Sequence, residues 1–336
     1  MTGRAAMARA LTSVLVGLFA LTGCGSGGDN TKPRIQSTVR PGVAPTPPTR
    51  GAYFGAWVDS GPRGSNQPTA FHAVLNFEQS IGRKLDIVNT YRTWDQPFPS
   101  TDDAAVLNSR RYLMLSWNGT DTRLITSGAQ DQIINARARA IKAAGRPIFL
   151  RFQWEMYRPN LKHRIHGPDD FIAAWRHVRA IFRQNRVNNV AWVWCPTSKG
   201  FKGKDQAAAY YPGDDQVDWL CADVYPELGY DYRDFSESAA AFLHFAKAHP
   251  KPIMIGEFGV PRSYGLRRPE WLRNAAQALQ KPQIKAVVDF DGDTYGIKPT
   301  ERMRFSLEGD QTAMSAMREL ATTPYFNPRN VPVNSD

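Results

Sequence analysis

The feature that most constrains the fold is a regular alternation of short apolar runs with amphipathic helical stretches between residues 51 and 336. Eight runs have the length and composition of β-strands, and several are apolar almost throughout, which is typical of parallel strands covered on both faces. The predicted strands span 53–59, 85–94, 111–118, 147–155, 190–196, 217–226, 252–259 and 284–292. Helical periodicity is expected over 69–83, 128–144, 168–187, 234–248, 269–281 and 311–322, with weaker candidates after the second and fifth strands.

Eight strand–helix units in one uninterrupted stretch predict an α/β fold of the (β/α)8, or TIM barrel, type, forming a single domain over residues 51–336. An open, doubly wound sheet is the alternative. That fold commonly carries a glycine-rich phosphate loop after its first strand, and the sequence contains neither GxGxxG nor GxxxxGKS. The barrel is therefore the favoured prediction.

The first 50 residues are expected to lie outside the barrel. Residues 1–23 combine a basic start with a short apolar stretch and are predicted to be a secretory signal peptide. The sequence LTGC at residues 21–24 resembles a bacterial lipobox, which implies cleavage before Cys24 and acylation of that residue. Residues 24–50, rich in Pro, Gly and Thr, are predicted to be a disordered tether. We expect an exported lipoprotein on the extracytoplasmic face of the cell membrane; a plain signal peptide with an incidental cysteine is the alternative.

Two glutamates end apolar runs, Glu155 in the fourth and Glu257 in the seventh. Because burying an unpaired charge is costly, such residues are expected at open strand ends, and in a (β/α)8 barrel the carboxyl ends of the strands form the active face. Two carboxylates facing each other in a ring of aromatic residues fit glycoside hydrolysis, in which one protonates the leaving oxygen and the other attacks the anomeric carbon. Other polar or aromatic residues at strand ends are Trp57, Tyr91, Trp94, Trp117, Trp194, Asp223 and Tyr225. For each Trp, packing in the core is an equally weighted alternative to contact with a sugar.

Four segments resemble glycoside hydrolase family 26, the β-mannanase family of the clan A retaining hydrolases. They are RFQWEMY (151–157), WVWCPT (192–197), YYPGDDQVDWLCADVYP (210–226) and KPIMIGEFGVP (251–261), and the resemblance covers roughly residues 50–300. It implies Glu155 as the acid/base and Glu257 as the nucleophile. It also implies that the Tyr225 hydroxyl bonds the nucleophile and that Trp194 lies near the sugar in subsite −1. Asp223 and Arg151, within the same segments, join the substrate-binding candidates.

The residues beside Glu155 depart from the family pattern, which places His before this Glu and Asn two residues after it. Here these positions hold Trp154 and Tyr157. Indole offers only an N–H donor, so the acceptor role of a His is lost, and both residues are expected to shape substrate choice. Desolvation beside Trp154 and Phe152 is expected to raise the pKa of Glu155, as a general acid requires.

The expected activity is that of a retaining, endo-acting β-glycosidase with β-1,4-mannan as the default substrate. Hydrolysis of a β-glucan, a xylan or an exopolysaccharide is the alternative, and exo-action on short oligosaccharides stays open. The competing class is a non-catalytic glycan-binding lipoprotein with a barrel fold.

Cys195 and Cys221 fall on predicted neighbouring strands. A disulfide is one option in an exported protein, but a cysteine on a barrel strand is more often a small buried hydrophobe, and we expect that arrangement.

No other partner class is indicated. Of the formal charge of +11, the signal and the tether carry +2 and +3, which leaves a modest +6 on the folded part. No basic patch with interleaved aromatic residues is present, so nucleic-acid binding is not expected. The sequence shows no complete set of metal ligands and no cofactor motif. We expect a monomer that binds a polysaccharide or oligosaccharide and contacts the membrane only through Cys24.

Overall fold

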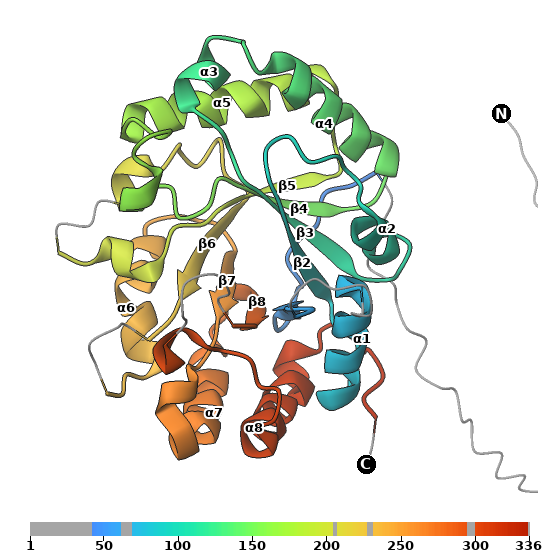
Figure 1. Ribbon diagram of the computed structural model, residues 1–336, viewed down its shortest axis with the longest axis vertical. Coiled ribbons are helices and arrows are strands. Elements are labelled where there is room, and N and C mark those ends of the chain that lie inside the picture. The colour runs from blue at the N-terminus through green and yellow to red at the C-terminus, as the bar shows by residue number, and fades with distance from the viewer. Residues whose placement is uncertain (1–41, 62–68, 204–206, 227–230, 294–299, 335–336) are drawn as a thin grey trace, which may run out of the picture. The chain divides into compact units, whose positions relative to one another are not determined.

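The centre of the molecule is a closed barrel of parallel strands, in a computed structural model that describes residues 42–61, 69–203, 207–226, 231–293 and 300–334. Each strand pairs with the next one in sequence, and β8 pairs with β1 (Figure 1). The strands are β1 (Tyr53–Val58), β2 (Ile87–Arg92), β3 (Tyr112–Trp117), β4 (Ile148–Phe152), β5 (Val190–Trp194), β6 (Trp219–Val224), β7 (Ile253–Phe258) and β8 (Ile284–Asp291). Closure confirms the predicted (β/α)8 barrel and excludes the open sheet.

The helices surround the strands (Figure 1). They are α1 (Ala70–Ser80), α2 (Thr101–Leu107), α3 (Thr122–Thr126), α4 (Asp131–Ala144), α5 (Pro168–Gln184), α6 (Phe235–Ala246), α7 (Arg268–Ala278) and α8 (Gln311–Thr322). Between β5 and β6 the described residues form only the 3-10 segments η2 (Ser198–Phe201) and η3 (Ala207–Tyr210). Within the described ranges, no helix combines the length and the apolar character needed to cross a membrane.

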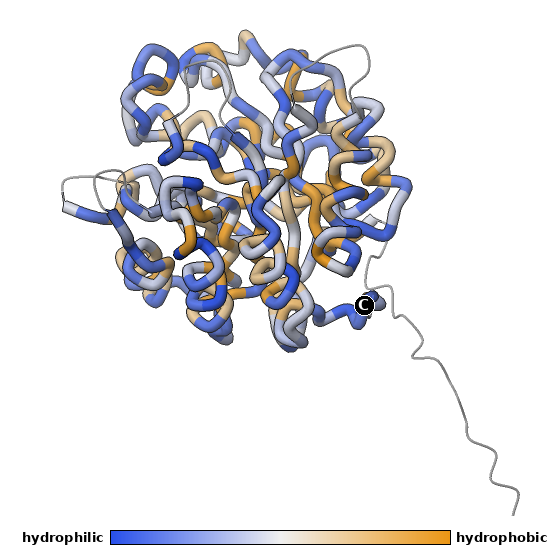
Figure 2. Tube along the Cα trace, turned by 60° about the horizontal axis from the view of Figure 1, so that its bottom comes forward, coloured by the Kyte–Doolittle hydropathy of each residue, from blue (hydrophilic) through white to orange (hydrophobic). Residues whose placement is uncertain are grey.

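Local sequence signals set several helix ends. A reciprocal capping box of Ser100 and Asp103 starts α2, and Asp234 with Glu237 starts α6 in the same way. Helix α4 ends at Gly145, which has a φ of 63° and so adopts a left-handed conformation that a glycine reaches without steric cost. Hydrophobic and hydrophilic positions alternate along the helical turns, as amphipathic helices require (Figure 2).

The core has two layers, because successive side chains of a strand point to opposite faces. One layer fills the barrel with side chains that include Tyr112, Phe149, Trp219 and Met254, and the other lies between the strands and the helices. The filled interior leaves open space for a site only at an end of the barrel.

Residues 42–50 pack against the folded domain, although the sequence predicts a tether there. Pro45 is buried, Ala44 packs against the barrel interior, and the backbone N–H of Gly42 donates to the carbonyl of Gly145 at 2.8 Å. The Tyr53 hydroxyl also donates to the carbonyl of Thr46, at 3.1 Å. The prediction of a disordered tether up to residue 50 is therefore wrong for residues 42–50, which lie at the amino ends of the strands. Residues 1–41, with the predicted signal peptide and Cys24, lie outside the described residues.

A buried ion cluster joins the start of the barrel to the C-terminal segment. The carboxylate of Asp86 accepts from Arg83 at 2.8 Å, from Arg329 at 3.4 Å and from the backbone N–H of Phe54 at 3.1 Å. Arg83 also donates to the carbonyls of Ala321 and Phe326. All three charged residues are at most 5% exposed, so none of the charges is screened by water.

We expect the variant Asp86→Ala to lose about 3–5 kcal/mol of unfolding free energy, because two arginines would keep buried charges without a carboxylate to neutralise them. Urea unfolding measures the loss. Arg273→Ala is the matched control, since Arg273 pairs with Glu319 on the surface, where both side chains are 51% exposed. Its expected loss is below about 1 kcal/mol. Equal losses in the two variants would contradict the assignment of a structural role to the cluster.

Candidate active site

A cleft of about 570 Å³ lies at the carboxyl ends of the strands and contains both predicted glutamates. Glu155 follows β4, and Glu257 is the penultimate residue of β7. Aromatic side chains form much of the rest of the wall, among them Tyr91, Trp154, Tyr225, Phe290 and Phe305. The cleft therefore places two carboxylates among flat apolar surfaces of the kind that sugar rings pack against.

Glu257 is held by three donors from three different strand ends. Its Oε1 accepts from the hydroxyl of Tyr91 and from Nη2 of Arg151, both at 2.6 Å. Its Oε2 accepts from the hydroxyl of Tyr225 at 2.9 Å, the contact that the family resemblance implies. Oε2 thus has fewer partners than Oε1 and keeps a lone pair that can attack an incoming carbon.

Arg151 is the fully buried cation that joins these groups. It donates through Nη1 to Asp223 at 2.9 Å, through Nη2 to Glu257, and through Nε to the Ser116 hydroxyl at 2.7 Å. Burial alone would lower the pKa of Arg151, but Asp223 and Glu257 together raise it above its usual value, so the guanidinium stays charged. Burial raises the pKa of Asp223 well above its usual range and Glu257 raises it further, while Arg151 opposes both effects.

Glu155 lies in a very different environment. Its backbone has a φ of 51°, and Gln153 has a φ of 47°; such left-handed conformations of non-glycine residues concentrate at functional sites. Its backbone N–H donates to the carbonyl of Cys195 at 2.8 Å, and its Oε2 accepts from Arg158. Burial and the nearby charge of Glu257 raise the pKa of Glu155, whereas Arg158 lowers it. The direction and the main cause agree with the prediction for a general acid.

Trp154 lines the cleft, Trp57 packs against two residues that line it, and Tyr157 lies behind it. The ring of Trp154 is 5.2 Å from that of Tyr91, with the guanidinium carbon of Arg151 at 5.0 Å from its centroid. Trp57 stacks on Phe290 at 4.5 Å and meets Tyr91 edge-on at 5.4 Å. The hydroxyl of Tyr157 is hydrogen-bonded to that of Thr197, which lines the cleft.

Three other predicted aromatic residues belong to the core instead. Trp94 and Trp117 stack on each other at 4.4 Å, and Trp117 is fully buried. Trp194 is also fully buried, its indole N–H donates to the carbonyl of Tyr210 at 3.1 Å, and its ring packs on Tyr211. The prediction that these residues contact substrate is corrected. Trp94 lies beyond the end of β2, and for Trp117 and Trp194 the reason is the twofold periodicity of strands. Their inward neighbours, Ser116 and Cys195, face the barrel interior.

The sequence analysis named Tyr91 only as a strand-end residue without a role and did not name Arg158, yet both touch a glutamate. Tyr91 ends a predicted strand and so carried a usable signal. Arg158 lies in the loop after β4, where no periodicity indicates the direction of a side chain. The wall formed by Met303 and Phe305 is contributed by the segment after β8, which only the closed barrel brings back to Glu155.

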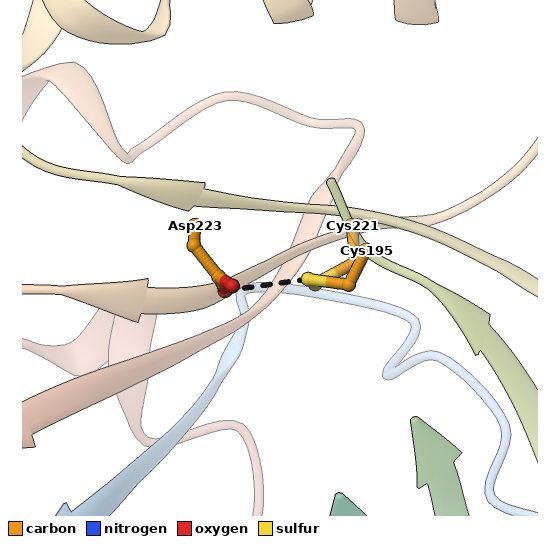
Figure 3. A group of neighbouring side chains, drawn as sticks. All are labelled: Cys195, Cys221 and Asp223. Carbon is orange, nitrogen blue, oxygen red and sulfur yellow. Dashed lines mark hydrogen bonds between the residues drawn. A yellow bond between two sulfur atoms is a disulfide. The ribbon is translucent and has the colours of Figure 1, made fainter. Parts of the chain in front are cut away.

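Cys195 and Cys221 form a disulfide beneath the cleft, so the expectation of two separate buried thiols is wrong. Figure 3 shows the pair beside Asp223, with Cys195 Sγ 3.3 Å from Asp223 Oδ1. A sulfur in a disulfide carries no proton, so this contact is a hydrogen bond only when Asp223 is protonated. Among the described residues, the two sulfurs and an Asp223 oxygen are the one group of three such atoms close enough to share a metal ion. Their mutual covalent bond leaves the sulfurs unable to act as thiolate ligands.

Comparison with known proteins places the chain in a defined group. A sequence model described as glycosyl hydrolase family 26 matches residues 96–283. "Endoglucanase H" of Acetivibrio thermocellus is 29% identical over 254 residues, which are 70% of this chain and 27% of that protein. "Beta-1,3-xylanase TXYA" of a Vibrio species is 28% identical over 158 residues, 45% of this chain and 31% of that protein. The matched part is thus about a third or less of the length of these relatives.

Solved structures show the same fold at lower identity. A family 26 β-mannanase from Bacteroides ovatus superposes with a TM-score of 0.58 and 15% identity, over 82% of this chain and 90% of that one. The catalytic domain of a Bacillus endo-β-1,4-mannanase gives a TM-score of 0.60 and 16% identity, over 82% and 87% of the two chains.

Proposed function

The chain belongs to glycosyl hydrolase family 26, and on that basis we propose that it is a retaining, endo-acting β-glycosidase that cleaves a polysaccharide by double displacement. The observation that carries the proposal is the contrast between its two glutamates. Glu257 is oriented by a cation and two hydroxyls, whereas burial raises the pKa of Glu155. A nucleophile must be ionised and a general acid must hold a proton, so the two environments suit the two roles.

In the first step Glu257 attacks the anomeric carbon while the bond to the leaving oxygen breaks, and Glu155 gives its proton to that oxygen. The product is a glycosyl ester on Glu257. In the second step the ionised Glu155 takes a proton from water, the resulting hydroxide attacks the anomeric carbon, and Glu257 leaves as a carboxylate. Two inversions at one carbon retain its configuration. Intact carboxylates with their donors in place argue against a purely glycan-binding role.

For the substrate, we propose β-1,4-mannan first and a β-glucan second. The solved structures with this fold include endo-β-1,4-mannanases, and the relative called "Endoglucanase H" supports the second candidate. The wall formed by Trp154, Tyr225 and Phe290 offers flat apolar faces to any pyranose chain. Trp154 lies directly beside Glu155, so we assign it to the choice between sugars next to the scissile bond.

We expect Glu155→Gln and Glu257→Gln each to lower kcat/KM by at least about 10²-fold, since general acid–base catalysis alone contributes about 10²–10⁴-fold. Reducing-sugar release from mannan, glucan, xylan and exopolysaccharide measures the loss, and NMR of the first product reports its anomer. The surface variant Glu319→Gln serves as the control and should match the wild type. Full activity of either active-site variant, or a product of inverted configuration, would refute the mechanism.

The ion pair between Arg158 and Glu155 predicts a shift of the pH profile. Arg158 stabilises the ionised Glu155 and so lowers its pKa; Arg158→Ala should raise that pKa further. The general acid must be protonated, so activity is lost as the pH rises through this pKa. The alkaline limb of kcat/KM should therefore move to higher pH in Arg158→Ala, while Arg158→Lys, which keeps the charge, should leave it nearly in place. An alkaline limb that moves to lower pH in the alanine variant would contradict the assignment.

We propose that lipidation at Cys24 anchors the enzyme in the membrane, on the grounds of the sequence LTGC at residues 21–24. The full-length protein expressed in a bacterium should fractionate with membranes and carry a fatty acyl group detectable by mass spectrometry. Cys24→Ala should release it into the soluble extracytoplasmic fraction with its hydrolytic rate unchanged. Membrane association that survives this substitution would contradict the proposal that a lipid on Cys24 anchors the enzyme.

A further inference from the structure

The Cys195–Cys221 disulfide cross-links β5 to β6 directly beneath the cleft. Both cysteines are fully buried and belong to the layer of side chains that fills the barrel. The backbone pairing that sets the spacing of β5 and β6 joins Val193 to Trp219 and Trp194 to Leu220, is interrupted at the two cysteines, and resumes at a bridge between Thr197 and Asp223. The disulfide fixes that spacing at the level where the site begins.

Two sets of contacts connect the disulfide to the proposed nucleophile, Glu257. Cys195 Sγ is 3.3 Å from Asp223 Oδ1 (Figure 3). It is also 3.9 Å from Nη1 of Arg151, the guanidinium whose other terminal nitrogen donates to Glu257. Gly256, which directly precedes Glu257, packs against both sulfurs. A Cβ at Gly256 would lie 2.5 Å from Cys221 Sγ and 2.8 Å from Cys195 Sγ. The backbone of β7 is therefore seated on the sulfur pair with no space between them.

The acid/base is tied to the same cross-link from the other side. The carbonyl of Cys195 accepts from the backbone N–H of Glu155 at 2.8 Å, and the carbonyl of Pro196 accepts from the N–H of Asp223 at 3.0 Å. The first of these bonds holds Glu155 in its left-handed conformation, beyond the last residue of β4. A displacement of Cys195 thus moves the backbone of Glu155.

We propose that the Cys195–Cys221 disulfide is a positioning element of the active site that sets the separation between Glu155 and Glu257. The inference rests on the proposed glycosidase function. Without the covalent bond, the two sulfurs would need a non-bonded separation of roughly 3.5 Å or more. Gly256, Asp223 and Arg151 surround them, so the extra space would come from the groups that hold the nucleophile.

The test compares the wild type with the double variant Cys195→Ser/Cys221→Ser. A misplacement of about 1 Å lowers the rate of an enzymatic reaction about 10²-fold, and we expect a fall in kcat of at least tenfold with KM within a factor of about two. The control is Leu272→Ala on α7, a buried residue outside the cleft, chosen to lower the melting temperature without touching the site. Assays are run well below both melting temperatures. A double variant that is less stable but has the wild-type kcat would show that the disulfide contributes only to stability, and would overturn the proposal.

A second variant and two further measurements keep the test decisive. Cys195→Ala/Cys221→Ala avoids burying two hydroxyls and replaces the serine variant if that protein does not fold. Alkylation of the unreduced, denatured wild type followed by mass spectrometry should leave both residues unlabelled, and free thiols there would overturn the proposal. Crystal structures of the wild type and the double variant should differ in the distance between the Glu155 and Glu257 carboxylates, and an unchanged distance would also overturn it. A wild type that cleaves no glycan refutes the proposed function instead. The thiol and distance measurements would still test whether the disulfide forms and whether it sets the separation of the two glutamates.

Discussion

The site depends on the hydrogen bonds and ion pairs made by the guanidinium of Arg151, which is fully buried. It lies between Asp223 and Glu257 and is bonded as well to Ser116, so one side chain of β4 connects to β3, β6 and β7. A buried cation with two carboxylate partners is expensive to break, because each group left alone would keep a charge away from water. The carboxylate of Glu257 therefore has a fixed orientation, which is the preorganisation that its proposed role as the nucleophile requires.

The same arrangement gives the two glutamates, Glu155 and Glu257, different surroundings. Glu257 receives hydrogen bonds on both oxygens from groups of the barrel itself. Glu155 lies on the loop beyond β4 and has Arg158 as its partner, a side chain that is 51% exposed. In the proposed mechanism, rigid donors surround the nucleophile Glu257, and an ion pair that water can screen accompanies the acid/base Glu155. The surroundings differ because Glu257 lies within β7, whereas Glu155 lies beyond the end of β4.

Much of the fold and part of the site could be predicted because both follow short-range patterns. The eight apolar runs predicted the eight strands, and the glutamates that end the fourth and seventh runs do meet in one cleft. The tryptophans show the limit of such reasoning. Trp117 and Trp194 are the last residues of their strands, whereas Glu257 is the penultimate residue of β7, and a shift of one residue turns a side chain from the barrel mouth into the layer beneath the helices. The irregular pairing of β7 with its neighbours, which brings Glu257 inward, has no visible signal in the sequence.

By itself, the sequence determined the class of fold, the membership of a hydrolase family and the two glutamates, since periodicity and short motifs are local properties of a chain. Only the tertiary structure decided the partners of those glutamates. Tyr91, Arg158 and the wall after β8 reach the site across large separations in sequence, and the two cysteines meet because β5 and β6 are adjacent. Barrel closure sets these distances, because it fixes the stagger of every strand against the next and so determines which strand ends share the cleft.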